Sequence, residues 1–203
     1  MVHLYKNGQR LAWALNLIRF NALLAVIDFP IQFYGLWAAG RASVDGSGFS
    51  GLNAYDAVSP VVGRVQLVAL FLAGFAFLLW WHRSVVNLGR AGQGLSFTPG
   101  WAVGMWFVPI LTFYLPYQAV KEAATTRAGV RPPNLALWWG AWVTGTVSTN
   151  VAGRLSGSAE TLAQVQTATM LYALSDAVTV LAALLVLPIM RFIQERQDHL
   201  ARS

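Results

Sequence analysis

Two aspartates in this sequence lie inside long apolar runs, where an ionisable side chain is costly. Asp28 falls within residues 11–39 and Asp176 within residues 168–190. In such surroundings a carboxyl group is usually paired with another group, and it marks a candidate site of proton or ion chemistry. Counting about 1.5 Å per residue along a helix places both aspartates in the outer half of the layer that the two runs would cross.

Two arginines, Arg64 and Arg154, fall at a similar depth by the same count. The sequence therefore predicts a polar cluster in which carboxylates and guanidiniums pair. The members of this predicted cluster are Asp28, Arg64, Arg154 and Asp176. The cluster would relay a proton or an ion, bind an anion on its arginines, or act as an ion pair that only fixes the register of the helices. The residue types leave all three readings open.

The chain lacks the side chains and motifs that metal binding, cofactor binding and catalysis usually require. The chain has no cysteine, and its three histidines, His3, His82 and His199, lie far apart in the sequence. No catalytic or nucleotide-binding motif is present. We therefore expect no bound metal, no cofactor and no enzymatic activity. The lysines and arginines are spread singly between apolar blocks, which offers no continuous track for a nucleic acid.

The composition places these residues in a membrane rather than in water. Of the 203 residues, 56% are hydrophobic and only 11% are charged, against roughly 25% charged residues in soluble domains. Four runs are long enough to cross about 30 Å of hydrocarbon as helices. They span residues 11–39, 61–82, 135–154 and 168–190. The sequence thus predicts one all-α membrane domain over residues 1–203, with residues 40–60 as a Gly/Ser-rich connection and residues 191–203 as a polar cytoplasmic tail.

A fifth apolar segment, residues 99–120, is interrupted by residues that are costly inside a helix. These interruptions are Pro99, Gly100, Gly104, Pro109 and Pro116. If the segment enters the membrane and returns, most of the lysines and arginines share one side, as is typical of cytoplasmic loops. If it crosses instead, this bias largely disappears. We therefore predict a re-entrant or interfacial segment, about four crossings, and both termini in the cytoplasm.

The same segment carries a motif that resembles a known family. It reads FTPGWAVGMWFVPI over residues 97–110 and PYQA over residues 116–119. With the residues around it, the motif resembles the central pattern of a bacterial membrane family, domain of unknown function 4328. The matching candidate residues are Arg83, Asn87, Pro99, Gly100, Trp101, Gly104, Trp106, Pro109, Pro116 and Glu122. The chain departs from the pattern at Met105 and Thr112, where the family has Trp and Asn. The resemblance implies a multi-pass protein of a bacterial cytoplasmic (inner) membrane and supplies no activity.

Two further patterns concern packing and aromatic contacts. In residues 135–154, small and hydroxyl side chains recur every four residues, which lets helices approach closely, and the alternative is a polar lining for a pore. The recurring positions are Gly140, Thr144 and Ser148, and again Gly145, Thr149 and Gly153. The tryptophans at Trp101 and Trp106 either anchor their segment at the membrane surface or form an aromatic pocket for a ligand.

Taken together, these patterns favour a noncatalytic membrane protein that serves as an accessory, scaffold or interaction subunit. Its expected partners are membrane lipids and either another membrane protein or a second copy of the chain. The alternative is a small transporter or channel that uses Asp28 and Asp176. The broken segment would contribute to that site, since discontinuous helices often carry binding sites in transporters.

Overall fold

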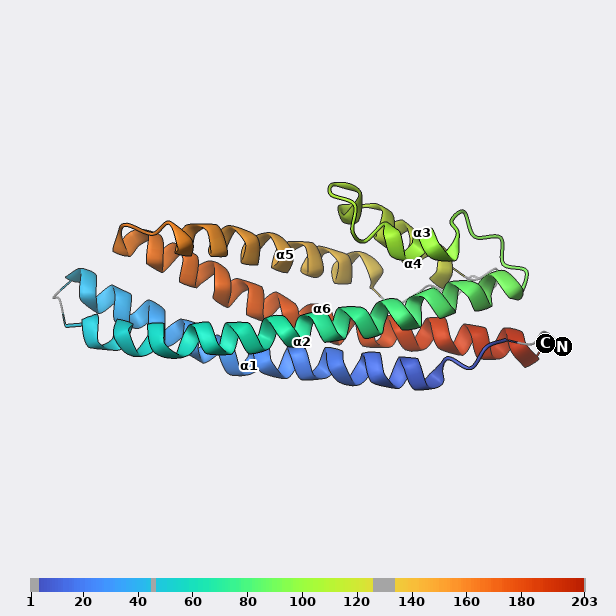
Figure 1. The fold of residues 1–203 in the computed structure, drawn as a ribbon, viewed down its shortest axis with the longest axis horizontal. Coiled ribbons are helices and arrows are strands. Elements are labelled where there is room, and N and C mark those ends of the chain that lie inside the picture. Colours follow the sequence, from blue (N-terminus) through green and yellow to red (C-terminus); the bar gives the residue numbers. More distant parts are fainter. Residues whose placement is uncertain (1–3, 45–46, 126–133, 203) are drawn as a thin grey trace. The chain divides into compact units, whose positions relative to one another are not determined.

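The computed structural model describes residues 4–44, 47–125 and 134–202, and this part of the chain contains helices and no strand. The long helices are α1 (Gly8–Val44), α2 (Phe49–Arg90), α5 (Leu135–Gly157) and α6 (Leu162–Arg202). Between α2 and α5 lie the short elements α3 (Pro99–Gly104), the 3-10 helix η1 (Leu111–Phe113) and α4 (Leu115–Ala124) (Figure 1). The prediction of an all-helical protein is confirmed for the described residues.

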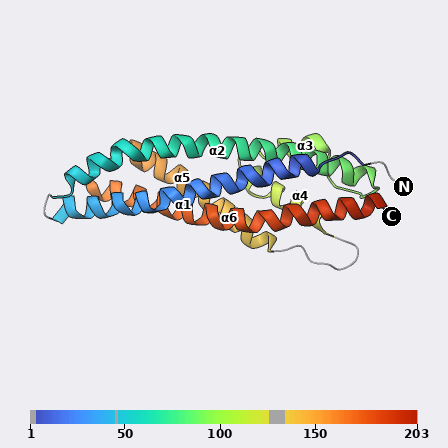
Figure 2. The same cartoon turned by 90° about the horizontal axis from the view of Figure 1, so that it is seen from below.

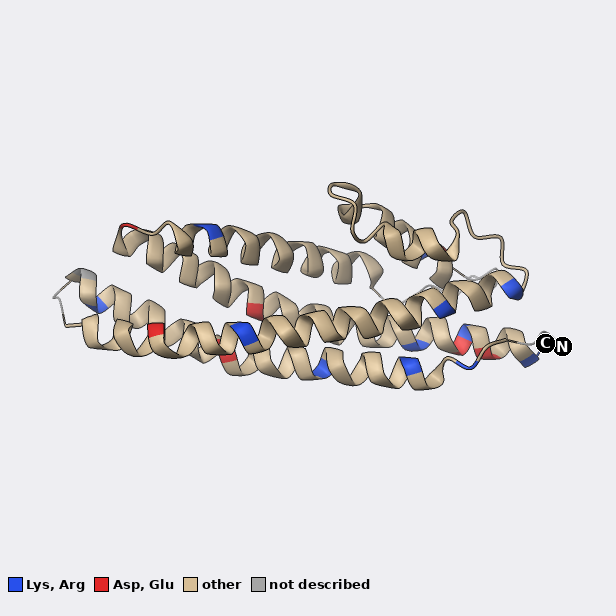
Figure 3. Cartoon of the chain, in the orientation of Figure 1, with Lys and Arg blue, Asp and Glu red and all other residues tan. Residues whose placement is uncertain are grey.

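Among the helices described, α1, α2 and α6 have the length and apolar composition of membrane crossings. Charged residues are sparse along their ribbons (Figure 3). The prolines Pro30, Pro60 and Pro188 lie inside these helices without ending them, as neighbouring helices allow in membranes. The 23 residues of α5 are also long enough, but its threonines, serines and asparagine make it less apolar. The fourth crossing and the return of residues 99–120 therefore stay predictions.

The helices extend further than the sequence patterns indicated. Residues 40–60, predicted as a connection, instead form the end of α1 and the start of α2, apart from the short link between these helices. Three alanines near the end of α1 pack with Leu52, and this burial offsets the poor helix propensity of nearby Gly and Ser. At Gly48 the chain passes so close to α1 that an added Cβ would overlap the carbonyl oxygen of Ala38.

Of the polar tail predicted for residues 191–203, the described residues, 191–202, are helical because α6 continues to Arg202. Ile193 and Gln197 are buried in this stretch, and Asn87 Nδ2 of α2 donates to Gln197 Oε1 at 3.0 Å. Tertiary packing therefore orders a segment whose composition alone indicated a solvated end.

The chain divides into two compact units, and each of the four long helices contributes a stretch to both. Unit 1 comprises Met1–Ile18, Phe71–Trp139 and Ala183–Ser203. Unit 2 comprises Arg19–Leu70 and Gly140–Ala182. Within unit 2, α1 and α2 run in opposite directions on either side of the link at Gly48 (Figure 2). The two aspartates singled out from the sequence belong to unit 2, and the family-like motif belongs to unit 1.

Unit 1 brings the beginning of the described chain beside the end of α6. Tyr5 N donates to Asn87 Oδ1, and Asn87 Nδ2 donates to the carbonyl oxygen of Tyr5, both at 2.9 Å. Because the same amide also contacts Gln197, one side chain of α2 connects both ends of the chain. The first described residues and the last turns of α6 thus lie at the same end of unit 1 (Figure 1).

Candidate functional site

The two aspartates singled out from the sequence meet in unit 2. Asp28 of α1 and Asp176 of α6 are 5% and 4% exposed, and their carboxyl groups lie within hydrogen-bonding reach of each other. The sequence placed both at a similar depth, and the packing of α1 and α6 brings them side by side. We call these two residues the carboxyl pair.

Two glutamines hold the carboxyl pair in place. Gln32 Nε2 donates to Asp28 Oδ2 at 2.9 Å, and Gln66 Nε2 donates to Asp176 Oδ1 at 3.0 Å. Tyr55 Oη in turn donates to Gln32 Oε1 at 2.7 Å. Hydrogen bonds from α2 therefore reach the pair from both sides: through Gln32 of α1 to Asp28, and directly from Gln66 to Asp176.

One oxygen of each carboxyl group is left over. Asp28 Oδ1 and Asp176 Oδ2 are buried, and neither has a hydrogen-bond partner among the described residues. An ionised carboxylate only accepts hydrogen bonds, and a buried acceptor without a donor is costly. A single proton placed between the two groups would satisfy both oxygens, as it does in the dyad of aspartic proteases.

Helical spacing explains how these side chains come together. Asp28, Gln32 and Gly35 lie four and three residues apart, so they share one face of α1. Gly35 leaves room for the ring of Tyr55, because an added Cβ would lie 2.6 Å from the ring atoms Cδ2 and Cε2. Tyr55 and Gln66 are eleven residues apart, which is about three turns, and they therefore share one face of α2.

The arginines predicted for the cluster lie elsewhere. The side chains of Arg64 and Arg154 are exposed, and the donors to the carboxyl pair are glutamine amides. On α2, Gln66 faces Asp176, and a residue two positions earlier points about 200° away around the helix. The structure thus does not bring the guanidiniums to the carboxylates, and amides stand where ion pairs were expected.

Gln32, Gln66 and Tyr55 are not among the residues predicted from the sequence, because the predicted cluster consisted of carboxylates and guanidiniums. A signal was present for two of them. Gln32 follows Asp28 by four residues, and Gln66 is a polar side chain inside an apolar run. Tyr55 lay in the stretch predicted as a connection, so only the observed start of α2 at Phe49 could reveal it.

The predicted small-residue faces of α5 serve two different roles. Gly145 packs closely against α6, since an added Cβ would lie 3.1 Å from Val178 Cγ2. The hydroxyl groups of Thr149 and Ser175 lie 2.5 Å apart, and Ser175 Oγ also donates to the carbonyl oxygen of Gly145 at 3.3 Å. One face therefore holds α5 against α6. On the other face, Gly140 has no described atom within 4 Å of an added Cβ.

In unit 1, side chains form hydrogen bonds with backbone groups of the segment interrupted by prolines and glycines, residues 99–120. Thr98 caps α3 by accepting from Trp101 N at 3.2 Å, and Pro99 stands in the first turn, where proline is tolerated. Trp81 Nε1 donates to the carbonyl oxygen of Ala102, and Trp139 Nε1 donates to that of Phe113, both at 2.9 Å. These indoles supply donors to carbonyl groups that an unbroken helix would satisfy itself.

The remaining motif residues stabilise the same unit in different ways. Glu122 accepts from the backbone N and the hydroxyl group of Ser96, at 2.7 and 2.5 Å. The ring of Trp106 packs edge-on against Phe77 and Trp139. The motif residues differ in burial. Asn87 and Pro116 are buried, Arg83 and Gly104 are half-buried, and Gly100, Trp101 and Pro109 are exposed.

A family model described as Domain of unknown function (DUF4328) matches residues 47–195 of the chain. No curated protein and no solved structure matches it. The matched region includes Tyr55, Gln66 and Asp176, whereas Asp28 and Gln32 precede it.

Proposed function

This chain belongs to the DUF4328 family, and from that premise we propose that it is a membrane protein that takes up and releases a proton at the carboxyl pair. The role that fits such a site is proton-coupled transport, with no enzymatic step. One observation carries the proposal: Asp28 and Asp176 are buried within reach of each other, and no basic side chain among the described residues pairs with either.

Electrostatics favour a proton over the other possible occupants. Two carboxylates about 4 Å apart repel each other by about 4 kcal/mol at an effective dielectric constant of about 20. Without an arginine or lysine beside them, such groups are expected to share one proton. A divalent cation would need about six oxygen ligands, and no group of three His, Cys, Asp or Glu suited to a metal occurs among the described residues.

Release of this proton would leave both carboxyl groups ionised, with a combined charge of −2 within the membrane, which is costly. The protein can lower that cost by moving α1 relative to α6 or by admitting water to the site. Either change links the protonation of the pair to the conformation of unit 2, and that link is the basis of coupled transport. The hydrogen bonds from the hydroxyl group of Tyr55 to Gln32 and from Gln32 to Asp28 hold in position the carboxyl group that takes up and releases the proton.

The proposed topology is a multi-pass protein of the bacterial inner membrane, with both termini in the cytoplasm. The contacts of Asn87 with Tyr5 and Gln197 support it, because they bring both ends of the described chain to the same end of unit 1. An even number of crossings has this property, and α5 is the proposed fourth. Residues 99–120 are proposed to return to the side from which they enter.

Proton flux through the purified full chain in proteoliposomes tests the proposal. A potassium diffusion potential drives the flux, and a dye inside the vesicles reports the pH. Asp28→Asn and Asp176→Asn are expected to abolish the protein-dependent flux. The matched control is Asp56→Asn, which changes an exposed aspartate of the same unit and is expected to leave the flux intact. If both buried variants conduct protons as the parent chain does, the proposal is wrong.

Infrared spectroscopy tests the shared proton without requiring transport. The parent chain in lipid nanodiscs is expected to show the carbonyl absorption of a protonated carboxyl group at neutral pH. Asp28→Asn and Asp176→Asn are expected to remove or shift this band, and Asp56→Asn is expected to keep it. A parent spectrum without such a band would mean that the pair is ionised, which contradicts the proposed mechanism.

An accessory or scaffold subunit is the second candidate, and the exposed part of one small-residue face of α5 favours it, although Ser148 of that face is buried. Gly140 and Thr144 are exposed, and no described atom occupies the space beside Gly140. A small-residue face of this kind suits close packing of a second membrane helix. Native mass spectrometry of the chain released from its own membrane tests this role. A stoichiometric partner protein or a second copy would support it, and a solitary chain would contradict it.

A further inference from the structure

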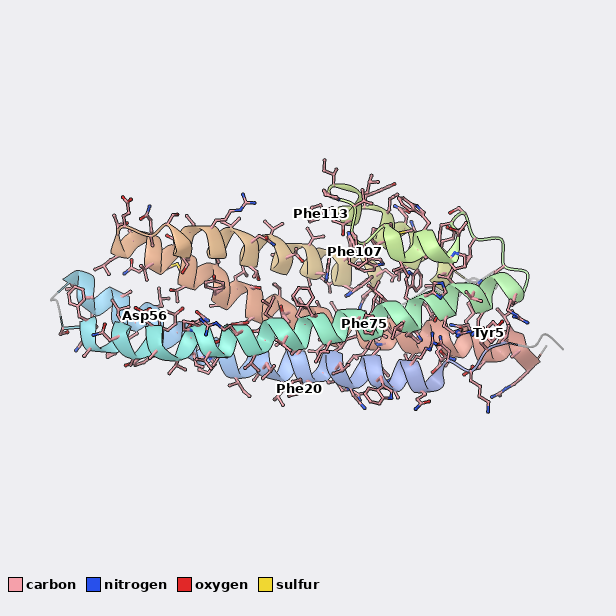
Figure 4. The ribbon with its side chains drawn as sticks, in the orientation of Figure 1. Tyr5, Phe20, Asp56, Phe75, Phe107 and Phe113 are labelled. Atoms are coloured by element: carbon pink, nitrogen blue, oxygen red, sulfur yellow. The ribbon has the colours of Figure 1, made fainter. Side chains whose placement is uncertain are left out.

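Two arginines of α2 lie over the ring of one tyrosine at the beginning of the chain. The guanidinium carbon Cζ of Arg83 is 4.4 Å from the centre of the Tyr5 ring, and Cζ of Arg90 is 4.5 Å from it. The arginines are seven residues apart, so they share one face of α2. Tyr5 lies beside the last turns of that helix (Figure 4).

The ring is held in this position by a buried side chain. The amide group of Asn87 exchanges two hydrogen bonds with the backbone of Tyr5, both at 2.9 Å, and Asn87 is 1% exposed. Asn87 also lies between Arg83 and Arg90 in the sequence. The buried amide of Asn87 therefore fixes Tyr5 beside the face of α2 that carries both arginines.

The two positive charges have no compensating carboxylate. Among the described residues, neither Arg83 nor Arg90 forms an ion pair, and Arg83 Nε is buried without a hydrogen-bond partner. Attraction to one aromatic ring offsets only part of the repulsion between two guanidiniums. The ring of Tyr5 and the side chain of Arg90 are exposed, and the exposed Lys6 adds a third positive charge nearby. The site is therefore open on one side and electropositive.

We propose that Arg83, Arg90 and Tyr5 bind a phosphate group. Guanidiniums donate parallel hydrogen bonds to phosphate oxygens, and the tyrosine ring holds both in a fixed position. The favoured source of the phosphate is the headgroup of an anionic phospholipid, because the site follows the apolar part of α2 directly, where a membrane surface would lie. A soluble phosphate ester has the same chemistry and is the alternative source. This site is independent of the carboxyl pair.

Native mass spectrometry of the full chain in detergent, titrated with anionic phosphatidylglycerol or zwitterionic phosphatidylcholine, tests the site. Arg83→Gln and Arg90→Gln are expected to weaken phosphatidylglycerol binding by about tenfold each, since a hydrogen bond to a charged group contributes a factor of that order. The control is Arg191→Gln, which removes the same charge from an exposed position of unit 1 and is expected to leave binding unchanged. Equal losses in all three variants, or no loss in any, would overturn the proposal.

Lysine variants test whether binding depends on the geometry of the guanidinium groups or only on their positive charge. Because they keep the charge, they also control for misfolding caused by its removal. Arg83→Lys and Arg90→Lys keep the charge, and they are expected to bind phosphatidylglycerol more weakly than the parent because an ammonium group cannot donate in parallel or stack in the same way. Lysine variants that bind as tightly as the parent would overturn the assigned geometry.

Glycerol phosphate without lipid identifies the source of the phosphate. If it binds the parent chain and loses affinity in Arg83→Gln and Arg90→Gln, the site takes a soluble phosphate ester. If only phosphatidylglycerol binds, the site takes a lipid headgroup. If neither binds, there is no phosphate site. Asp28→Asn is expected to bind phosphatidylglycerol like the parent, so failure of the carboxyl-pair proposal would leave this result intact.

Discussion

Gly35 is the position where a single methyl group should disturb the candidate site most clearly. It lies on the same face of α1 as Asp28 and Gln32, and the ring of Tyr55 occupies the space that a side chain at this position would need. In Gly35→Ala the new Cβ would stand 2.6 Å from two ring atoms. The ring must therefore move, and its hydroxyl group would be drawn away from Gln32 Oε1, to which it donates at 2.7 Å.

The expected loss of stability follows from three contributions. Replacing glycine by alanine within a helix stabilises it by about 1 kcal/mol when the methyl group meets open space. Overpacking at a close contact costs about 1–3 kcal/mol, and loss of the hydrogen bond from Tyr55 costs about 1 kcal/mol more. We therefore expect Gly35→Ala to lower the free energy of unfolding by about 1–3 kcal/mol.

Unfolding of the purified chain in mixed micelles, followed by circular dichroism, measures this change. Gly63→Ala is the matched control, because an added Cβ at Gly63 meets no described atom within 4 Å; it should be neutral or stabilising. In a Tyr55→Ala background, Gly35→Ala should lose its penalty, since the ring is gone. If Gly35→Ala stabilises the parent chain as much as Gly63→Ala does, the close contact between α1 and the ring does not exist.

Three further substitutions test other contacts, two by the same unfolding assay and one by proteolysis. Gln66→Leu removes the amide donor to Asp176 Oδ1 and should destabilise the chain by about 1–3 kcal/mol; an unchanged stability would show that this amide does not hold the carboxyl group. Tyr55→Phe removes only the hydroxyl group and should cost about 1 kcal/mol, with no added cost once Gln32 is replaced by Leu. Trp139→Phe removes the donor to the carbonyl oxygen of Phe113 and should speed proteolysis around η1; a parent-like cleavage rate would argue against that role of the indole.

The carboxyl pair shows what counting residues along predicted helices can establish and what it cannot. Counting residues placed Asp28 and Asp176 at a similar level, and the structure brings them together. The same count placed Arg64 at that level too, yet its side chain is exposed while Gln66 reaches the pair. Depth depends only on position along a helix, whereas the direction of a side chain depends on which face the neighbouring helices cover. The interpretation of the pair as a proton site rather than an ion pair depends on side-chain direction, because the side chains that reach it are glutamine amides and not arginines.

Composition and local pattern alone determined the class of this protein. The scarcity of charge and the long apolar runs indicated helices suited to a membrane, and the motif at residues 97–110 indicated the family, because both properties are written in consecutive residues. Tertiary structure decided where the helices end and which polar groups meet. Residues 40–44, 49–60 and 191–202 are helical because they pack against other helices, and Gln32, Gln66 and Tyr55 surround the aspartates because separate helices face each other there. Such contacts join residues far apart in the chain, so no local pattern contains them.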